Sequence, residues 1–337
     1  MLSEYEKMPD TLKKLGLESN DFSKLEKYKW VVTEKVHGAN FSFVYEKNNL
    51  KFAKRKEYLS WKDDFFGYQL VVNKLEDKIL RLFEKLSTQT KASKLIVYGE
   101  LFGGKYPHVD VSIEEKVNAI QTGVYYSPTI EFYAFDIAVE VEGKTKYYLD
   151  YKTSLDLFEE FEIFHAKPLF IGKLNEAVNF NKRINSSIPK ALNLPEIKDN
   201  LIEGIVIKPY NMDLDIKIAR PIIKLKNEEF DEEKKFHQAE KWSFVSNLSS
   251  KTESLSFMMD ELRNYITDNR LKSAISKIGS LNLNDQLRIE EIKTEFYQDV
   301  IVSFNENNDN ILEELTVDER EWLKERIIFE VNKMIFS

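Results

Sequence analysis

A lysine, a histidine and a glycine stand close together in the segment EKVHGAN, which runs from Glu34 to Asn40. The segment lies between two apolar runs, WVVT and FSFVY, so we expect it to end or interrupt a strand. Two interpretations of Lys35 are open: a solvated charge at a hairpin turn, or a nucleophile beside a bound phosphate. A nucleophilic lysine must lose its proton, and the pKa of a free lysine side chain is about 10.4. Burial or neighbouring cations are needed to lower that pKa.

The sequence offers such cations in two other segments. In PIIKLKN, a strand would place Lys224 and Lys226 on one face and the two apolar residues between and before them on the other. The alternative is an edge strand that lysines protect from pairing with another chain. Arg55, in KFAKR, is a candidate ligand for a phosphate or a sugar, and otherwise an exposed surface arginine.

Carboxylates and one aromatic residue form a second set of candidates. Glu100 stands in YGELFGG, Glu203 begins EGIVIK, and Asp136 lies inside the apolar run FYAFDIAV. The first two suit a turn or a strand end, whereas an acid inside an apolar run needs a partner because burying it alone is costly. Carboxylates near phosphates hold Mg²⁺, and lysines with Mg²⁺ supply the charge that phosphoryl transfer requires. Phe135 either stacks on a base or fills the core.

Strands are the elements that must position these residues. Between residues 30 and 240, short runs rich in Val, Ile, Tyr and Phe recur, with helical spacing between them in residues 68–86, where four apolar side chains share a face (Leu75, Ile79, Leu82 and Leu86). Strands and helices do not alternate strictly, so antiparallel sheets flanked by helices are favoured over a doubly wound parallel sheet. The sequence predicts an α+β domain over residues 1–240.

The pattern changes to helical after residue 245. Apolar residues from Leu255 to Ile266 recur at helical spacing, and the helical pattern stops at Gly279. Thr316 and Glu319 form a capping box before the last apolar run. We therefore predict a small all-α C-terminal domain over residues 245–337.

Composition sets outer bounds on function. The 337 residues contain no cysteine, which excludes disulfides, thiolate zinc sites and cysteine nucleophiles. The net charge is −8, of which −6 falls on residues 241–337, so the first 240 residues are nearly neutral and can still carry a basic groove. No apolar run approaches the roughly 20 residues that cross a bilayer, and no secretory segment begins the chain, so we expect a cytoplasmic protein, cellular or phage-encoded, without a membrane partner.

Five segments in order resemble the motifs of the covalent nucleotidyltransferases, the superfamily of ATP-dependent ligases and mRNA capping enzymes. They read KVHG at 35–38, YGELFGG at 98–104, EFYAFDI at 131–137, EGIVIK at 203–208 and IKLK at 223–226. DNA ligases and capping enzymes usually have aspartate where this chain has His37, and KVHGAN is similar to the RNA ligase 2 group, which includes phage-type and RNA-editing ligases. The resemblance covers residues 30–235, and Gly38 then fits a tight turn that brings backbone close to the nucleotide.

The resemblance implies a nucleotidyltransferase domain, ATP-grasp-like, followed by a helical rather than β-barrel domain. It implies an ATP-dependent RNA ligase that seals 3′-OH/5′-phosphate nicks, preferentially in duplex RNA, in three steps. Lys35 takes AMP from ATP and releases pyrophosphate, AMP passes to an RNA 5′-phosphate, and a 3′-OH attacks that activated phosphate. The implied partners are nicked double-stranded RNA, or RNA held on a complementary strand, and the protein would act as a monomer.

The resemblance also implies roles for individual residues. The nucleotide ligands would be Glu34, Lys35, Val36, Asn40, Arg55, Glu100, Phe135, Val206, Lys224 and Lys226. Within this set Glu100 would bind the ribose, Phe135 and Val206 would hold the adenine, and the last two lysines would contact the α-phosphate. Glu203 and Asp136 would serve Mg²⁺ or Mn²⁺, directly or through water. His37 and Lys208 match the motifs without an assigned role.

Two alternatives remain at this point. A DNA ligase or a guanylyltransferase of the same superfamily would share the five segments, although His37 and the helical end of the chain count against it. A catalytically inactive relative that binds nucleic acid would form no AMP adduct, although every expected motif residue is present.

Overall fold

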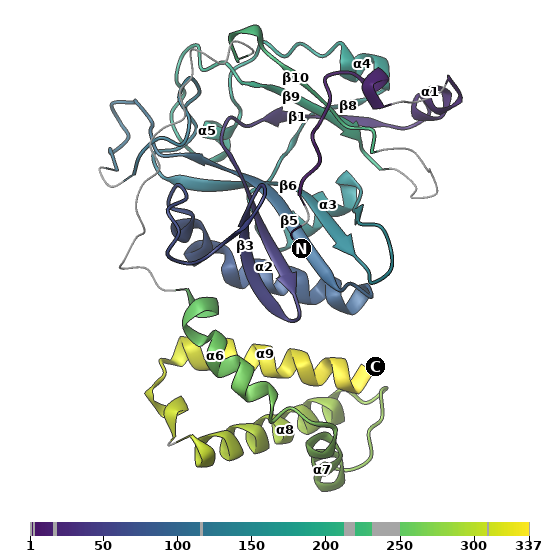
Figure 1. Cartoon of the computed structure of the whole chain (residues 1–337), viewed down its shortest axis with the longest axis vertical. Helices are drawn as coiled ribbons and strands as arrows, with labels where there is room; N and C mark the ends of the chain where they lie inside the picture. The colour runs from purple at the N-terminus through teal and green to yellow at the C-terminus, as the bar shows by residue number, and fades with distance from the viewer. Residues whose placement is uncertain are drawn as a thin grey trace. The chain divides into compact units, whose positions relative to one another are not determined.

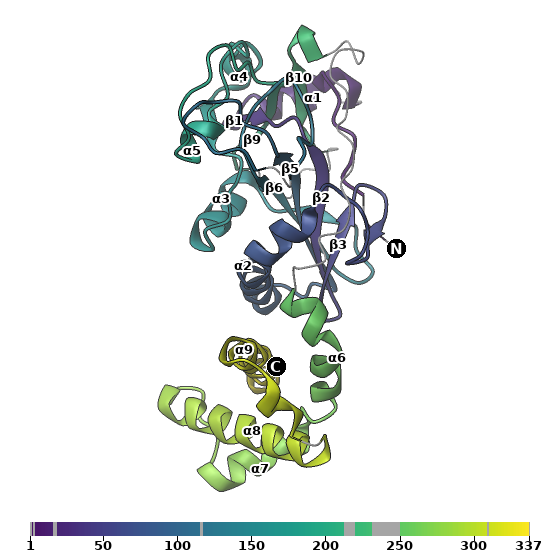
Figure 2. The same ribbon diagram turned by 90° about the vertical axis from the view of Figure 1, so that its left-hand side faces the viewer.

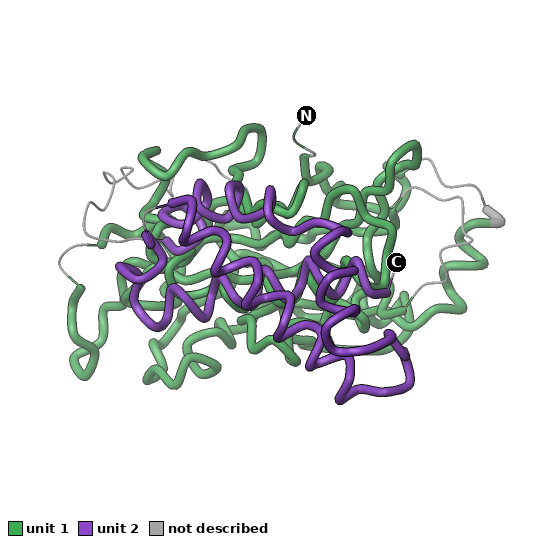
Figure 3. Tube along the Cα trace, turned by 90° about the horizontal axis from the view of Figure 1, so that it is seen from below, with its two compact units in different colours: residues 1–248 green, residues 249–337 purple. Residues whose placement is uncertain are grey.

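The computed structural model describes residues 2, 4–15, 19–114, 117–211, 220–230, 250–308 and 310–336. The chain divides into two compact units, Met1–Leu248 and Ser249–Ser337, which Figure 3 draws in different colours. The domain boundary that we predict at residues 240–245 lies outside the described residues.

Unit 1 combines two sheets with helices and confirms the α+β class. Its strands are β1 (Trp30–Lys35), β2 (Ala39–Glu46), β3 (Asn49–Lys54), β4 (Tyr58–Leu59), β5 (Lys94–Gly103), β6 (Ile130–Glu140), β7 (Tyr147–Tyr148), β8 (Pro168–Gly172), β9 (Gly204–Pro209) and β10 (Ile223–Lys226). Its helices are η1 (Leu12–Leu15), α1 (Ser19–Leu25), α2 (Tyr68–Gln89), α3 (Tyr151–Glu160), α4 (Leu174–Val178), α5 (Ile188–Ala191) and η2 (Glu228–Phe230).

The strands form a four-stranded sheet in the order β10-β9-β1-β8 and a six-stranded sheet in the order β4-β3-β2-β5-β6-β7. Every neighbouring pair is antiparallel, as the lack of strict strand–helix alternation predicts. β1 and β2 follow each other in sequence but belong to different sheets (Figure 1). The segment that carries Lys35 therefore joins the two sheets instead of closing a hairpin.

Side chains alternate on the six-stranded sheet so that both faces are buried. Phe41, Phe43 and Tyr45 of β2 contact aromatic rings on the side of α2, where Tyr45 stacks on Phe83. The intervening Val44 packs on the opposite face. Helix α2 packs against β2, β5 and β6, and Figure 2 shows it along one face of this sheet. Of the four apolar residues predicted to share a face of this helix, three are buried and Leu75 is partly buried.

The four-stranded sheet has one apolar face and one polar face. Trp30 and Val32 of β1 pack with Ile205, Ile207 and Ile223 in one core cluster. The period of two along each strand leaves the residues between them for the other face. That other face carries most of the chemistry-bearing residues of the sequence.

Unit 2 is all-α over its described residues, with α6 (Lys251–Arg263), α7 (Asp268–Ile278), α8 (Gln286–Asn307), η3 (Ile311–Glu314) and α9 (Val317–Phe336). The helical spacing that runs through Ile266 predicts one continuous helix, but α6 ends at Arg263. A new helix begins after Thr267, because the Thr267 side chain accepts a hydrogen bond from the Arg270 amide. The capping box is confirmed, since Thr316 and Glu319 exchange backbone-to-side-chain hydrogen bonds. None of the helices in the described part of the chain has the length and apolar character that a bilayer crossing requires.

Candidate active site

The polar face of the four-stranded sheet arranges Lys35 and two other lysines in cross-strand rows. Lys35 pairs with Gly204 of β9, which pairs with Lys226 of β10. In the next row Val206 of β9 pairs with Lys224. The apolar residues between these lysines lie on the core face, so the alternation predicted for β10 is confirmed, and β10 is also an edge strand.

The Glu203 carboxylate binds both Lys35 and Lys226 and lies near His37. We call these four residues the Glu203 cluster. Lys35 Nζ donates to Glu203 Oε2 at 2.6 Å, and Lys226 Nζ lies 2.9 Å from Oε1. His37 Nδ1 lies 3.5 Å from Oε2. Burial alone would raise the pKa of Glu203, but Lys35, His37 and Lys226 outweigh it and hold that pKa well below its usual range. The carboxylate is therefore ionised and bound to the candidate nucleophile.

The six-stranded sheet supplies the other side of the pocket beside Lys35. Asn40 of β2 pairs with Glu100 of β5, and both line the pocket with Arg55. Burial raises the pKa of the Glu100 carboxyl to about 7, and Lys35 and Arg55 oppose this effect only in part. Burial, Lys35 and Lys226 lower the pKa of Lys224.

Apolar side chains line the pocket from both sheets. Phe135 comes from β6 and Val206 from β9, so two apolar surfaces border the same pocket from different sheets. Val36, which follows Lys35, also lines it. A flat ring between a phenyl group and a branched aliphatic group is the arrangement that base stacking uses.

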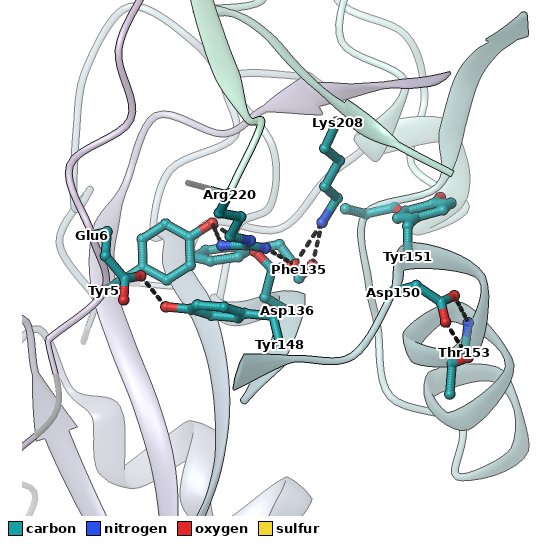
Figure 4. A network of polar contacts seen from close by, with 11 residues as sticks. Tyr5, Glu6, Phe135, Asp136, Tyr148, Asp150, Tyr151, Thr153, Lys208 and Arg220 are labelled. Carbon is teal, nitrogen blue, oxygen red and sulfur yellow. Dashed lines mark hydrogen bonds and ion pairs between the residues drawn. The ribbon is translucent and has the colours of Figure 1, made fainter. Parts of the chain in front are cut away.

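Asp136 is buried and bound by three donors, which Figure 4 shows pointing toward its carboxylate. Tyr5 Oη donates to Oδ2 at 2.6 Å, Lys208 Nζ donates to Oδ1 at 2.8 Å, and Arg220 Nη2 lies 2.6 Å from Oδ1. We call these four residues the Asp136 cluster. Burial would raise the pKa of Asp136, and Arg220 and Lys208 more than offset it, so the pKa is lowered. Both carboxylate oxygens thus have protein partners, and the metal role predicted for Asp136 stays a prediction.

Lys208, to which the sequence assigns no role, contacts both Asp136 and the backbone beside it. Its Nζ also donates to the Phe135 carbonyl oxygen at 2.8 Å. It lies over the ring of Tyr151, 5.2 Å from the centroid. Burial lowers the pKa of Lys208 although Asp136 opposes this. Lys208 thereby fixes the backbone from which the Phe135 side chain extends.

Glu34 lines the pocket, but its carboxylate oxygens accept hydrogen bonds from a loop. Ser186 Oγ donates to Oε1 at 2.6 Å, and the Ser187 amide and hydroxyl donate to Oε2 at 2.9 and 2.8 Å. Burial raises the pKa of Glu34, and these three donors act against that rise. The contacts fix the strand end just before Lys35.

The turn after Lys35 is held by residues that the sequence patterns do not indicate. The His37 amide donates to the Tyr126 hydroxyl at 3.0 Å, and Gln121 Nε2 donates to the Gly38 carbonyl oxygen at 3.4 Å. A Cβ at Gly38 would lie 2.1 Å from the Leu101 carbonyl oxygen. The close approach of β5 therefore requires a glycine at this position, and the approach of its backbone to the nucleotide stays a prediction.

The pocket also has a wall that the five segments do not predict. Tyr5, Glu6, Lys7 and Met8 line it, and Arg220 binds Tyr5 and Asp136 at its edge. No pattern in the sequence marks these residues, because their partners are far along the chain.

A shallow depression adjoins the pocket and shares Asn40, Arg55 and Glu100 with it. The remaining residues that line it are Gly38, Ala39, Lys54, Lys56, Glu57, Phe65 and Phe66. Basic side chains beside aromatic rings are the surface that binds nucleic acid through phosphates and bases.

The donor set for a divalent cation is small. Among the described residues, no group of three or more histidine or acidic side chains surrounds a common metal position. Mg²⁺ in nucleotide sites usually takes one or two protein carboxylates and completes its shell with phosphates and water. Glu203 fits that pattern, because its carboxylate is ionised and lies beside the cations that would meet a phosphate.

Comparisons with known proteins identify the family of this chain. The family described as RNA ligase matches residues 28–226, and the one described as T4 RNA ligase 2 C-terminal matches residues 249–333. The mitochondrial RNA-editing ligase 2 of Trypanosoma brucei brucei is 26% identical over 91% of this chain and 84% of that protein. The mitochondrial RNA-editing ligase 1 of the same organism is 26% identical over 93% of this chain and 78% of that protein.

Among solved structures, an RNA ligase of Naegleria gruberi is 16% identical with a TM-score of 0.42, over 69% of this chain and 58% of that chain. The first family match spans more than half of the sequence, and the second falls in unit 2. The chain belongs to the RNA ligase family, in its RNA ligase 2 group.

Proposed function

We propose that the protein is an ATP-dependent RNA ligase that joins an RNA 3′-OH to an RNA 5′-phosphate through a lysyl-AMP intermediate. The observation that carries the proposal is the sheet face on which Lys35, Lys224 and Lys226 meet beside a pocket bordered by Phe135 and Val206. Cations and apolar walls at these places suit a nucleotide whose α-phosphate faces Lys35. RNA as substrate is supported by the family and by relatives that are named RNA-editing ligases.

In the first step the Lys35 amine attacks the α-phosphorus of ATP. A P–N bond forms, the P–O bond to pyrophosphate breaks, and pyrophosphate leaves, while the proton of the nitrogen passes to water. Lys224 and Lys226 stabilise the charge that builds on the α-phosphate oxygens. Glu100 binds the ribose, and Phe135 and Val206 hold the adenine.

A divalent cation, Mg²⁺ or Mn²⁺, would add positive charge at the phosphates when bound. Glu203 is the residue that we propose to hold it, directly or through water. Asp136 is not part of this proposal, because its partner Lys208 is 6% exposed and also binds the Phe135 carbonyl oxygen, whereas the Lys35 side chain beside Glu203 is 17% exposed.

In the second step an RNA 5′-phosphate oxygen attacks the lysyl-AMP, and the P–N bond breaks. In the third step a 3′-OH attacks the activated 5′-phosphate, and AMP leaves. We assign the RNA ends to the depression that adjoins the pocket, because Asn40 and Arg55 line both. A 5′-phosphate there would lie between the nucleotide and the basic surface of Lys54 and Lys56.

We further propose that the substrate is a nick in duplex RNA, and that a monomer of the protein seals it in the cytoplasm. The RNA ends of a nick are held in line by the complementary strand, which lowers the entropic cost of joining them. Unit 2 would help to bind the duplex, so truncation after residue 245 is expected to spare AMP transfer to Lys35 and to impair sealing. Equal sealing by full-length and truncated protein would refute that role.

The experiment that tests the proposal is incubation with α-labelled ATP or GTP and a divalent cation, followed by denaturing electrophoresis. We expect a labelled adduct from ATP alone. A label from GTP alone would indicate a guanylyltransferase, and no label from either would indicate an inactive nucleic-acid-binding relative.

A second measurement separates RNA from DNA ligation. Sealing is compared on nicked RNA–RNA, RNA–DNA and DNA–DNA duplexes that carry the same sequence and a 5′-phosphate. The proposal predicts the highest rate on RNA–RNA. A rate that is highest on DNA–DNA would support the DNA ligase alternative.

A further inference from the structure

Residues 4–10, which we call the N-terminal strap, include four residues, from Tyr5 to Met8, that line the nucleotide pocket. The ring of Tyr5 meets the ring of Phe135 edge-on, with centroids 5.0 Å apart and an interplanar angle of 72°. At the other end, the Lys224 amide donates to the Pro9 carbonyl oxygen at 2.9 Å. The strap thus begins beside the proposed adenine wall and ends beside a proposed α-phosphate ligand, and Met8 lines the pocket between them.

The outer edge of the strap is tied to β7 and the turn before it. Lys146 Nζ donates to the Glu4 carbonyl oxygen at 2.7 Å and lies 2.7 Å from Glu6 Oε1. The Tyr148 hydroxyl donates to the Glu6 carboxylate (Figure 4). These contacts hold the strap to the six-stranded sheet, while Pro9 holds it to the four-stranded sheet.

The inner edge is tied to the Asp136 cluster through one hydroxyl. Tyr5 Oη donates to Asp136 Oδ2 at 2.6 Å and accepts from Arg220 Nη1 at 2.9 Å. Burial raises the pKa of Tyr5 well above its usual value, so the hydroxyl keeps the proton that it donates. The guanidinium of Arg220 lies over the Tyr148 ring, 3.7 Å from its centroid.

Phe135 is therefore fixed from two directions. Lys208 binds its carbonyl oxygen, and the Tyr5 ring contacts its ring at an interplanar angle of 72°. A ring that must lie flat against a base loses stacking energy when it tilts, because stacking depends on parallel overlap. One contact of the Phe135 ring therefore comes from the strap.

We propose that Tyr5 is a positioning residue of the nucleotide site, which holds the Phe135 ring in the orientation that receives adenine. The inference rests on the proposed function, in which Phe135 is the adenine wall. The remaining strap contacts keep Tyr5 in place, so weakening them has the same effect to a smaller degree. A strap that only covers the core would leave nucleotide affinity unchanged when these contacts are cut.

Three variants of the full-length protein test the inference. Tyr5→Phe keeps the ring and removes both hydrogen bonds of the hydroxyl. The double variant Glu6→Gln with Lys146→Met cuts the outer attachment. Lys85→Met is the matched control, because it removes an ion pair with Glu160 on the surface of the same unit.

Two readouts separate positioning from stability. The first is the affinity for adenosine 5′-(α,β-methylene)triphosphate, which binds without transferring AMP, measured by calorimetry. The second is the KM for ATP and the maximal rate of adduct formation. We expect about tenfold weaker analogue binding and a similar rise in KM for Tyr5→Phe, about threefold for the double variant, and no change for the control. The maximal rate is expected to stay within about twofold, because Lys35 and its neighbours are untouched.

Two results would overturn the inference while the proposed function stands. One is that the wild type forms the adduct and Tyr5→Phe binds the ATP analogue as tightly as the wild type does. The other is a drop in melting temperature for Tyr5→Phe without a change in KM, which would give the hydroxyl a structural role alone. Absence of an adduct in the wild type would instead overturn the proposed function, and the inference with it.

Discussion

Glu203 and Asp136 are two buried carboxylates, each bound by two basic side chains, and the sequence predicts the same metal role for both. They differ in how the cations around them are held. Among the residues that the structure describes, Lys35 Nζ has Glu203 as its one hydrogen-bond partner, and the Lys35 side chain is 17% exposed. Lys208 is 6% exposed and binds a carboxylate, a carbonyl oxygen and the face of a ring.

The difference separates a reactive cluster from a structural one. A lysine with one carboxylate partner can exchange it for a phosphate at the cost of one ion pair. A lysine with three partners cannot move away without leaving all three of them buried and unpaired, which is costly. We therefore propose that the same pair of residue types does chemistry in the Glu203 cluster and holds backbone in the Asp136 cluster.

The largest effect is expected from Lys35→Ala. Loss of the nucleophile should lower the rate of adduct formation by roughly a thousandfold or more, because no other group replaces its nitrogen. The free energy of unfolding in urea should fall, but the buried Glu203 carboxylate keeps Lys226 and His37 as partners. A labelled adduct that persists in this variant would show that Lys35 is not the nucleophile.

Asp136→Ala should have the largest effect on folding. It leaves Lys208 and Arg220 without their carboxylate, and breaking a buried ion pair from one side costs about 3–5 kcal/mol. Urea unfolding at neutral pH measures the loss, with Asp136→Asn as the control that keeps the volume and part of the hydrogen bonding. A stable variant whose adduct formation recovers with excess Mn²⁺ would restore the metal role.

Glu203→Gln is expected to lower activity more than stability, in contrast to Asp136→Ala. Adduct formation should fall about a hundredfold, because an ionised group beside the phosphates is lost. The free energy of unfolding should fall by only about 1–2 kcal/mol, since Lys35 and Lys226 reach water from a pocket. If the stability loss matches that of Asp136→Ala, the contrast between the two clusters is wrong.

Glu100 is expected to change stability with pH in the opposite direction to Glu203 and Asp136. Its pKa is raised to about 7 by burial, whereas the pKa values of Glu203 and Asp136 are lowered. The folded state therefore holds a proton that the unfolded state releases, so the contribution of Glu100 to stability is present below its unfolded pKa and is lost as pH rises through 7.

The corresponding measurement compares wild type with Glu100→Gln at pH 5 and pH 8. The free energy of unfolding of the variant minus that of wild type should be about 2 kcal/mol larger at pH 8 than at pH 5, because the amide does not titrate. A difference that is independent of pH would contradict the raised pKa.

Local patterns predicted much of the fold, because they reflect interactions within a few residues. The alternation of Lys224 and Lys226 with apolar neighbours, the helical face of residues 68–86 and the capping box at Thr316 all follow from local geometry. The break before Thr267 was missed, since a hydroxyl that begins a helix competes with an apolar pattern that continues.

Long-range partners could not be predicted in the same way. Tyr5 is 131 residues from Asp136, and Lys208 is 72 residues from it. A sequence states that an acid inside an apolar run needs a partner, but not which cation or hydroxyl the fold brings to it. The sequence alone therefore could not predict the contacts of the Asp136 cluster and the N-terminal strap, which depend on how the fold brings the two sheets together.

The connection Val36–Gly38 between β1 and β2 makes chain length itself a condition of activity. One inserted residue would turn every side chain of β2 to the opposite face of its sheet, exchanging Phe41 with Asn40, or else push Lys35 out of its row with Lys226. Loops elsewhere in the molecule accept insertions at small cost. Val36 should tolerate a change of residue type better than a change in the number of residues in this connection, which a library of single-residue substitutions, insertions and deletions would reveal.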